Sequence, residues 1–424
     1  MEVEVGTKTE HPATIRFDAQ YRPRGAVRVD GADAESLRWQ IPQRVRAGME
    51  IEWRGVSARA QFQDVREWGG EPGVRSTFAA TGLHQGYGQI AGARGKLSGF
   101  VRLGRQEMAY GSFRMLGNAP WNPNGQALNG LRLHGQSGPW SLDVGGFLLK
   151  TRESFVVETE GGREEERSTG GEWLGTVELA WNAHRSANLA LYSFFNNSAP
   201  DADHPSRETY LATPGLRVYG EPVAGLTYDV EGYAQFGRWY GRDHAAWSLA
   251  TTLRYDFDAG PVRPGLMVSY AIASGESCDV APTDEGECSG SGTHTRFDPL
   301  FGSRHRYLGY ADWFAYTNVR DLQAGPELRV GKILRARAHY HFLQLDRPDG
   351  AWIRTSLGTV GGGAVLDSEE RTVGHELDLR LQARPWAPLE IDVGYAVLLP
   401  TGIGTELLSA EPQHFAYLMT TVQF

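Results

Sequence analysis

Apolar and polar residues alternate with a period of two along most of the chain. Residues 43–54 show the pattern well, because one face of this run carries Val45, Ala47, Met49, Ile51 and Trp53 and the other face carries mostly Arg and Glu. The same alternation returns in residues 172–182 and 376–382. A period of two indicates a β-strand with one polar and one apolar side. Each run is about ten residues long, the length of a tilted strand that crosses a bilayer.

About eighteen such runs follow one another, and this even number suits a closed barrel. They start near residues 15, 44, 56, 83, 97, 128, 140, 172, 188, 209, 226, 245, 263, 318, 334, 373, 389 and 414. The predicted connections alternate between short turns and long loops, and the long loops cover about residues 25–42, 66–82, 107–126, 151–171, 196–208, 237–244, 271–317, 346–371 and 398–413. This asymmetry is typical of outer-membrane barrels and not of soluble sandwiches or propellers. We therefore expect an all-β fold, a single transmembrane antiparallel β-barrel of about 18 strands over residues 1–424, with short periplasmic turns and long extracellular loops.

The last run, with Ala416, Leu418, Thr420, Val422 and Phe424 on one face, ends the chain on an aromatic residue. This ending resembles the closing-strand signal that bacterial barrel-insertion machinery recognises. In the hydrocarbon layer only a closed sheet satisfies every backbone N–H and C=O, so the polar face must point into the lumen. Barrels of about 16 to 18 strands usually leave an aqueous channel, and conduction is the expected function.

The composition excludes other classes of protein. No run approaches the roughly 20 apolar residues of a membrane-spanning helix. A net charge of −9 without any block of Lys or Arg argues against nucleic-acid binding. Only four of the 42 basic residues are Lys, so Arg is the main cation. The first residues lack the basic and apolar regions of a secretory signal, as expected of a trimmed mature chain.

The two cysteines, Cys278 and Cys288, flank a Gly-, Asp- and Glu-rich stretch, and we expect a disulfide that closes a surface loop. Two Cys without a second pair make poor zinc spacing, and no cofactor is expected. His339 and His341 lie two apart on an inward-facing strand, where they could titrate or hold a metal, although a polar wall is the favoured interpretation. No nucleophile elbow is present, so no enzyme is expected.

The predicted loop 271–317 is rich in aromatic residues. Its large apolar side chains are Phe297, Phe301, Tyr307, Tyr310, Trp313 and Phe314. These side chains are too apolar for a solvated loop, so we expect the segment to fold back as a plug or lid. Simple packing inside the vestibule would give the same sequence pattern.

Three segments resemble the alginate-export outer-membrane porin family. They are RVRAGMEIEW with SARAQFQDVREWG (residues 44–53 and 57–69), LGRQEMAYGSFRMLGNAPW with NGLRLHG (103–121 and 129–135), and FDPLFGSRHRYLGYADWFAYTNVRDLQAG (297–325). The resemblance implies an eighteen-stranded monomeric barrel with an electropositive constriction, through which an anionic polysaccharide leaves the periplasm. It is specific for the family and not for the solute.

The matching segments supply candidate pore-lining residues: Arg44, Arg46, Arg59, Arg102, Arg105, Arg132 and Arg320. Alternation assigns all of them to the lumen except Arg105 and Arg320, and for Arg105 the strand register and the motif disagree. Arg335 and Arg337, beside the two histidines, complete the set.

A uronic-acid polymer carries one carboxylate per sugar, and a ring of Arg in a narrow neck would offset its dehydration. The alternation also turns acids inward: Asp18, Glu50, Glu52, Glu178, Asp229, Glu231, Glu376, Asp378, Glu390 and Asp392. A mesh of ion pairs that stiffens the wall is therefore the alternative interpretation of any single Arg.

The sequence thus predicts a channel in the outer membrane of a Gram-negative bacterium that passes an alginate-like polysaccharide or small anionic solutes. Expected partners are the solute, outer-membrane lipid with lipopolysaccharide and periplasmic export proteins, with no nucleic acid and a single copy of the chain. Two alternatives stay open. One is a general diffusion or nutrient-uptake porin, and the other is a plugged structural barrel that docks envelope partners.

Overall fold

Eighteen antiparallel strands form a closed sheet in the computed structural model. The structure describes residues 2–5, 12–30, 37–70, 80–151, 154–158, 164–168, 171–198, 208–258, 260–283, 286–288, 292–365 and 367–424. Each barrel strand pairs with the next along the chain, and the last pairs with the first, as in Gln20 opposite Gln423. The barrel strands are β2 (Ala13–Val29), β4 (Pro42–Trp53), β5 (Val56–Glu67), β6 (Ala80–Arg94), β7 (Leu97–Gln106), β8 (Leu128–Ser137), β9 (Trp140–Lys150), β12 (Glu172–His184), β13 (Ala187–Ser198), β14 (Thr209–Val223), β15 (Leu226–Trp239), β16 (Arg242–Asp256), β17 (Val262–Ala273), β18 (Val319–Val330), β19 (Leu334–Gln344), β20 (Thr372–Trp386), β21 (Leu389–Pro400) and β22 (Gln413–Gln423).

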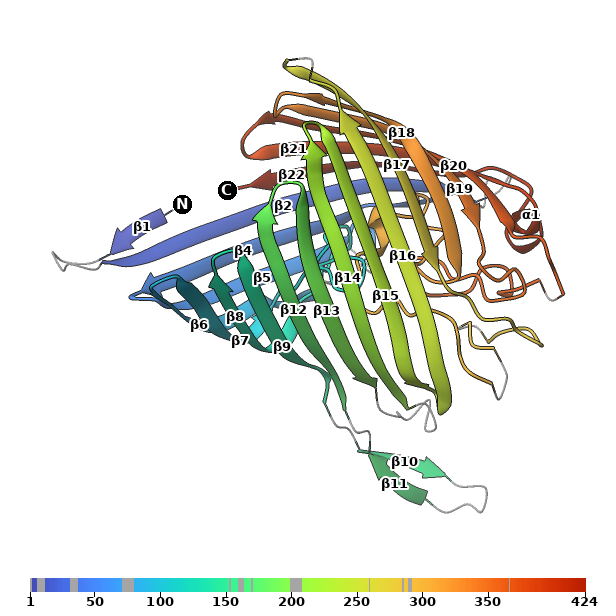
Figure 1. Cartoon of the computed structure of the whole chain (residues 1–424), viewed down its shortest axis with the longest axis horizontal. Coiled ribbons are helices and arrows are strands. Elements are labelled where there is room, and N and C mark those ends of the chain that lie inside the picture. Colours follow the sequence, from blue (N-terminus) through green and yellow to red (C-terminus); the bar gives the residue numbers. More distant parts are fainter. Residues whose placement is uncertain are drawn as a thin grey trace.

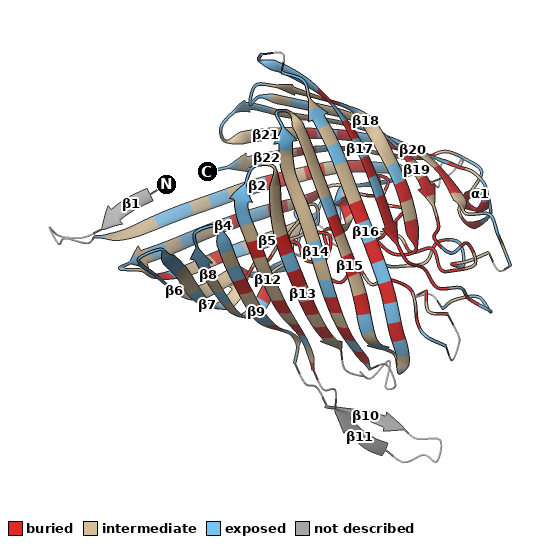
Figure 2. Ribbon diagram, viewed as in Figure 1, coloured by how far each residue is buried: buried red, intermediate tan, exposed pale blue. Residues whose placement is uncertain are grey.

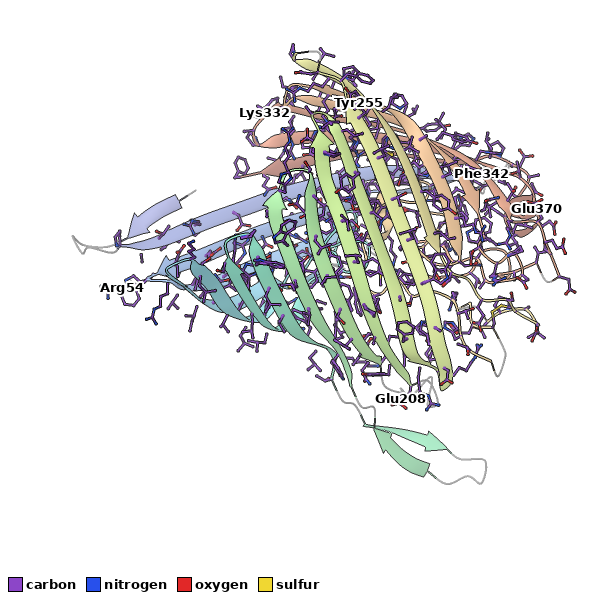
Figure 3. The ribbon with its side chains drawn as sticks, in the orientation of Figure 1. Arg54, Glu208, Tyr255, Lys332, Phe342 and Glu370 are labelled. Carbon is purple, nitrogen blue, oxygen red and sulfur yellow. A yellow bond between two sulfur atoms is a disulfide. The ribbon has the colours of Figure 1, made fainter. Side chains whose placement is uncertain are left out.

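The two ends of the barrel differ. One end, here called the turn end, carries the short turns and both chain termini (Figure 1). The opposite end, the loop end, carries the long connections, with Glu208 and Glu370 far from Arg54 and Lys332 of the turn end (Figure 3). A closed sheet has no free edge, so every strand in it is paired on both sides.

Short elements accompany the barrel strands. The strands β1 (Glu2–Val5) and β3 (Leu37–Gln40) pair with the beginning and the end of β2. The loop end carries the hairpin of β10 (Ser154–Glu158) and β11 (Glu164–Ser168), the 3-10 turn η2 (Arg304–Arg306) and the helix α1 (Ile403–Leu407). In the described part of the chain, no helix has both the length and the apolar character needed to cross a membrane.

The predicted strands and the observed strands agree closely. Every predicted start lies within three residues of an observed start. Two predicted loops need correction. The predicted loop 25–42 is partly strand, because β2 extends to Val29 and pairs with β3, and residues 237–244 form no long loop. Trp239 pairs with Arg242 across a two-residue turn, in which Tyr240 and Gly241 both have positive φ angles. The ladder continues here although the side chains stop alternating, since backbone hydrogen bonds do not depend on side-chain polarity.

The outer surface of the barrel is apolar. On β16, Trp247, Leu249 and Leu253 are exposed, whereas the intervening Ser248 and Ala250 are buried. The same banding of exposed and buried residues runs along the neighbouring strands (Figure 2). Such a broad exposed apolar surface suits contact with lipid, and the polar face of each strand then lines the lumen.

Part of the hydrophobic core lies inside the barrel, formed by loops at the loop end. Phe297, Phe314 and Trp352 come from these loops and are at most 1% exposed. The predicted 271–317 loop corresponds to residues 274–318, which join β17 to β18. Its main chain contacts inward side chains of the wall, and the amide of Tyr310 donates to Asp378 Oδ2 at 3.0 Å. The wall and the inward loops therefore pack as one body at this end.

Candidate functional site

Two loops meet inside the barrel and form a partition across its lumen. The first is residues 107–127, between β7 and β8, and the second is residues 274–318. Their main chains pair where Phe301 N donates to Met115 O at 3.0 Å and Gly117 N donates to Phe301 O at 3.1 Å. The rings of Trp121 and His305 stack nearby with centroids 3.7 Å apart. The partition narrows the space that a solute can use.

One cavity continues past this partition, with a volume of about 1170 Å³. Gln423, Glu390 and Arg335 line it at the turn end, and Asp30 and Arg38 line it at the loop end. Because this cavity reaches side chains near both ends of the barrel, it is the candidate passage through the lumen, and it is called the passage below.

The lining of this passage is strongly positive. It contains thirteen arginines and six carboxylates, an excess of seven positive charges with histidine counted as neutral. The arginines are Arg22, Arg24, Arg28, Arg38, Arg44, Arg254, Arg304, Arg306, Arg329, Arg335, Arg337, Arg354 and Arg380. This local excess contrasts with the net charge of −9 for the whole chain. The net charge of the whole chain therefore does not show the charge of the passage.

Several predicted residues lie on the lumen side and differ in their partners. Arg335 and Arg44 line the passage and make no ion pair with a described carboxylate, and Arg337 contacts Glu327 at 3.6 Å. Arg46 pairs with Glu107 at 3.0 Å. These arginines share the lumen face but do not share one electrostatic role.

The remaining predicted lumen arginines are bound to the wall. Arg59 pairs with Asp18 at 2.7 Å beside a second cavity of about 560 Å³. Arg132 pairs with Asp143 at 2.8 Å. Arg102 donates to Gln89 at 2.7 Å. The alternative interpretation, in which arginines form ion pairs within the wall, therefore fits Arg59 and Arg132.

Two candidate pore residues point away from the lumen, which corrects the prediction for Arg105 and Arg320. Arg105 precedes the buried, inward Gln106 and donates to the Leu83 carbonyl at 3.0 Å on the outer side. Arg320 precedes the buried, inward Asp321 and binds Asp346 at 2.8 Å. Successive side chains of a strand point to opposite faces, so strand parity overrides the family motif at both positions.

A row of arginines on β2 was not predicted. Arg22 and Arg24 are buried in the lumen face, and Arg28 follows on the same face, where it donates to the Ala311 carbonyl at 2.7 Å. Their parity matches that of Asp18, which the alternation had already assigned to the lumen. Pro23 and Gly25 interrupt the polar and apolar alternation in this stretch, so the row did not stand out.

Glu107, at the start of the first loop, ties that loop to the wall. Its carboxylate accepts from Arg46, from His84 at 2.7 Å and from Asn118 at 3.1 Å. Burial opposes its ionisation, but these hydrogen bonds and the nearby positive charge outweigh burial and lower the pKa of Glu107 to about 2. The group is therefore a stable anion at neutral pH.

The two candidate histidines each lie beside a carboxylate of the wall. His341 Nδ1 is 3.0 Å from Asp321, and His339 Nε2 is 3.3 Å from Glu327. Across the residues that the structure describes, no group of three or more potential ligands could hold a metal ion. A disulfide joins Cys278 and Cys288 within the second loop.

Solved structures of outer membrane proteins share this fold. OprD from Pseudomonas aeruginosa has a TM-score of 0.61 at 13% identity, with 97% of this chain and 93% of that chain covered. OccAB4 from Acinetobacter baumannii has a TM-score of 0.62 at 11% identity, with 97% and 98% covered. Identities this low show the fold alone. No curated protein matches the sequence.

The family comparison covers nearly the whole chain. The model of the Alginate export family matches residues 10–402. The match spans the barrel from before β2 to the helix α1, and so includes both loops of the partition. The chain therefore belongs to the alginate-export family of outer-membrane porins, as a Gram-negative outer-membrane β-barrel with an arginine-rich passage.

Proposed function

We propose that this channel passes anionic solutes that carry carboxylates, with an alginate-like polysaccharide as the favoured solute, and performs no chemistry on them. The observation that carries the proposal is the excess of seven positive charges along the passage. A guanidinium binds a carboxylate in a planar, bidentate arrangement, so arginine suits this solute better than lysine does.

Passage also requires release. A solute that loses water in a narrow neck must gain enough from the wall to enter, and must bind each position weakly enough to leave. Arginines follow one another along the passage from Arg335 near the turn end to Arg38 at the loop end. A chain with one carboxylate per sugar can exchange one guanidinium for the next, so no single site has to hold it tightly.

A second candidate is uptake or diffusion of small organic anions. The stack of Trp121 on His305 bridges the two loops and favours this candidate, because a narrow partition suits a small solute better than a polymer. For the polymer to pass, we propose that residues 274–318 act as a lid over the lumen. Because one barrel encloses its own lumen cavity, we propose that a single copy of the chain is the functional unit. Lipid and lipopolysaccharide would cover the apolar outer surface.

Planar-bilayer recording of the purified barrel tests the proposal. The reversal potential in a KCl gradient measures the ratio of anion to cation permeability, and trigalacturonate and alginate serve as anionic blockers, with neutral maltotriose as the matched control. We expect anion selectivity and block by both uronates. Block by the trimer alone would favour the small-anion candidate. Equal permeabilities without block by either uronate would contradict the proposal, and negligible conductance would favour a plugged structural barrel.

A further inference from the structure

A short segment of the first loop covers the arginine row on β2 and β4. Five consecutive main-chain carbonyls, those of residues 120–124, each accept a hydrogen bond from the wall. The donors, in chain order of the carbonyls, are Arg22 to Pro120, Arg24 to Trp121 at 2.8 Å, Arg22 to Asn122 at 3.2 Å, Arg44 to Pro123 at 3.4 Å and Gln63 to Asn124 at 3.0 Å. Residues 120–124 therefore lie along the wall, with five consecutive carbonyl groups as hydrogen-bond acceptors.

The three arginines that hold this segment have only neutral partners. Among the described residues, Arg22, Arg24 and Arg44 bind carbonyl or amide oxygens and the face of an indole ring, and none forms an ion pair with a carboxylate. Neighbouring Arg46 and Arg59 do pair with carboxylates. Three buried positive charges whose hydrogen-bond partners are all neutral form a site for negative charge.

A solute carboxylate can compete for these donors. It carries a full negative charge and accepts two parallel N–H bonds from one guanidinium, so it binds more strongly than a neutral carbonyl. Residues 120–124 belong to the same chain as these arginines, so their carbonyls compete with the solute at high effective concentration. Several carboxylates on one chain are also held at high effective concentration once the first has bound, so they compete better than isolated carboxylates do.

We propose that residues 120–124 are a displaceable occupant of a carboxylate-binding row formed by Arg22, Arg24 and Arg44. A chain with carboxylates on successive sugars takes over the donors, releases the segment into the lumen and widens the passage at the partition. The inference rests on the proposed function and adds that the solute opens its own route. Pro120 and Pro123 fit this role, because they lack N–H groups and leave the segment few hydrogen bonds of its own to lose.

A spin label on the segment tests displacement directly. The only two cysteines of the chain are joined in a disulfide, so Asn124→Cys provides a single reactive thiol at an exposed position. Electron paramagnetic resonance of the labelled, reconstituted barrel should show an immobilised component. Trigalacturonate should remove this component, whereas maltotriose, and acetate at the same carboxylate concentration, should leave it unchanged.

Two variants test whether the arginines hold residues 120–124 in place. Arg22→Gln combined with Arg44→Gln removes the donors to three of the five carbonyls, so the label should lose its immobilised component without any solute. Arg105→Gln removes an outward arginine that binds only neutral partners and should behave as the parent. If the label stays immobilised in the double variant, or if trigalacturonate blocks current without releasing the label, the displacement proposal fails while the proposed function stands. Absence of both block and release contradicts the proposed function itself, and release by acetate contradicts the need for a chain of carboxylates.

Discussion

Replacing Arg335 changes the charge of the passage while removing no described contact. Arg335 lies on the lumen face of β19, lines the passage and is exposed to the lumen. In the described part of the chain it has no hydrogen bond or ion pair. Arg335→Gln therefore removes one positive charge, and Arg335→Glu exchanges a positive for a negative charge, without leaving a partner unsatisfied.

The size of the effect follows from Coulomb's law. A permeating ion about 5 Å from the charge, in a water-filled lumen, interacts with it by about 0.8 kcal/mol. Removing the charge should therefore change the anion permeability and the cation permeability by about fourfold each, in opposite directions, so that their ratio falls about 16-fold. Reversing the charge doubles the interaction energy and should lower the same ratio by about 250-fold. Salt at about 1 M reduces the Debye length to about 3 Å, so the effect should fall below about twofold there.

The assay is the reversal potential of the reconstituted barrel in KCl gradients centred near 0.1 M and near 1 M. Arg105→Gln is the matched control, since it removes the same charge from the outward face of β7, where Arg105 binds the Leu83 carbonyl. The control should leave selectivity unchanged at both salt concentrations. An unchanged reversal potential for Arg335→Glu at low salt would refute the idea that lining charge sets selectivity.

Two further predictions concern the loops. Gly309 has a φ of +86° and faces the carboxylate of Glu376, so Gly309→Ala should destabilise the second loop by about 1 to 3 kcal/mol. Amide hydrogen exchange of residues 304–316 should therefore accelerate. Gly358→Ala is the control, because an added methyl group there meets only ordinary contacts, and it should leave this exchange unchanged. Because the pKa of Glu107 is lowered from 4.5 to about 2, its anchoring of the first loop should be complete above pH 4.5 and decline as the pH falls toward 2. Exchange in residues 107–118, corrected for intrinsic rates, should rise in that window only, and Glu107→Gln should remove the step; a parent profile without a step would contradict the assignment.

The barrel could be predicted from sequence because lipid imposes a local rule. A strand between lipid and water must place apolar residues at every second position, so residues 43–54 reveal their strand without any knowledge of the fold. The rule weakens where a strand leaves the membrane, which explains why the turn at Tyr240 and Gly241 was predicted as a loop. It also loses force at Pro23, where the arginine row on β2 was missed.

The arrangement of the candidate site depends on contacts that no local pattern contains. Arg22 meets the carbonyl of Pro120, 98 residues away, and Arg28 meets that of Ala311, 283 residues away. Strand parity places Arg320 on the outer face although its motif matches the family. The number of strands, the membrane location and the family follow from periodicity and motif, so they could be predicted without a structure. Which arginines face the passage, and which groups they bind, became known from the folded barrel, because closing the sheet brings distant segments together in the lumen.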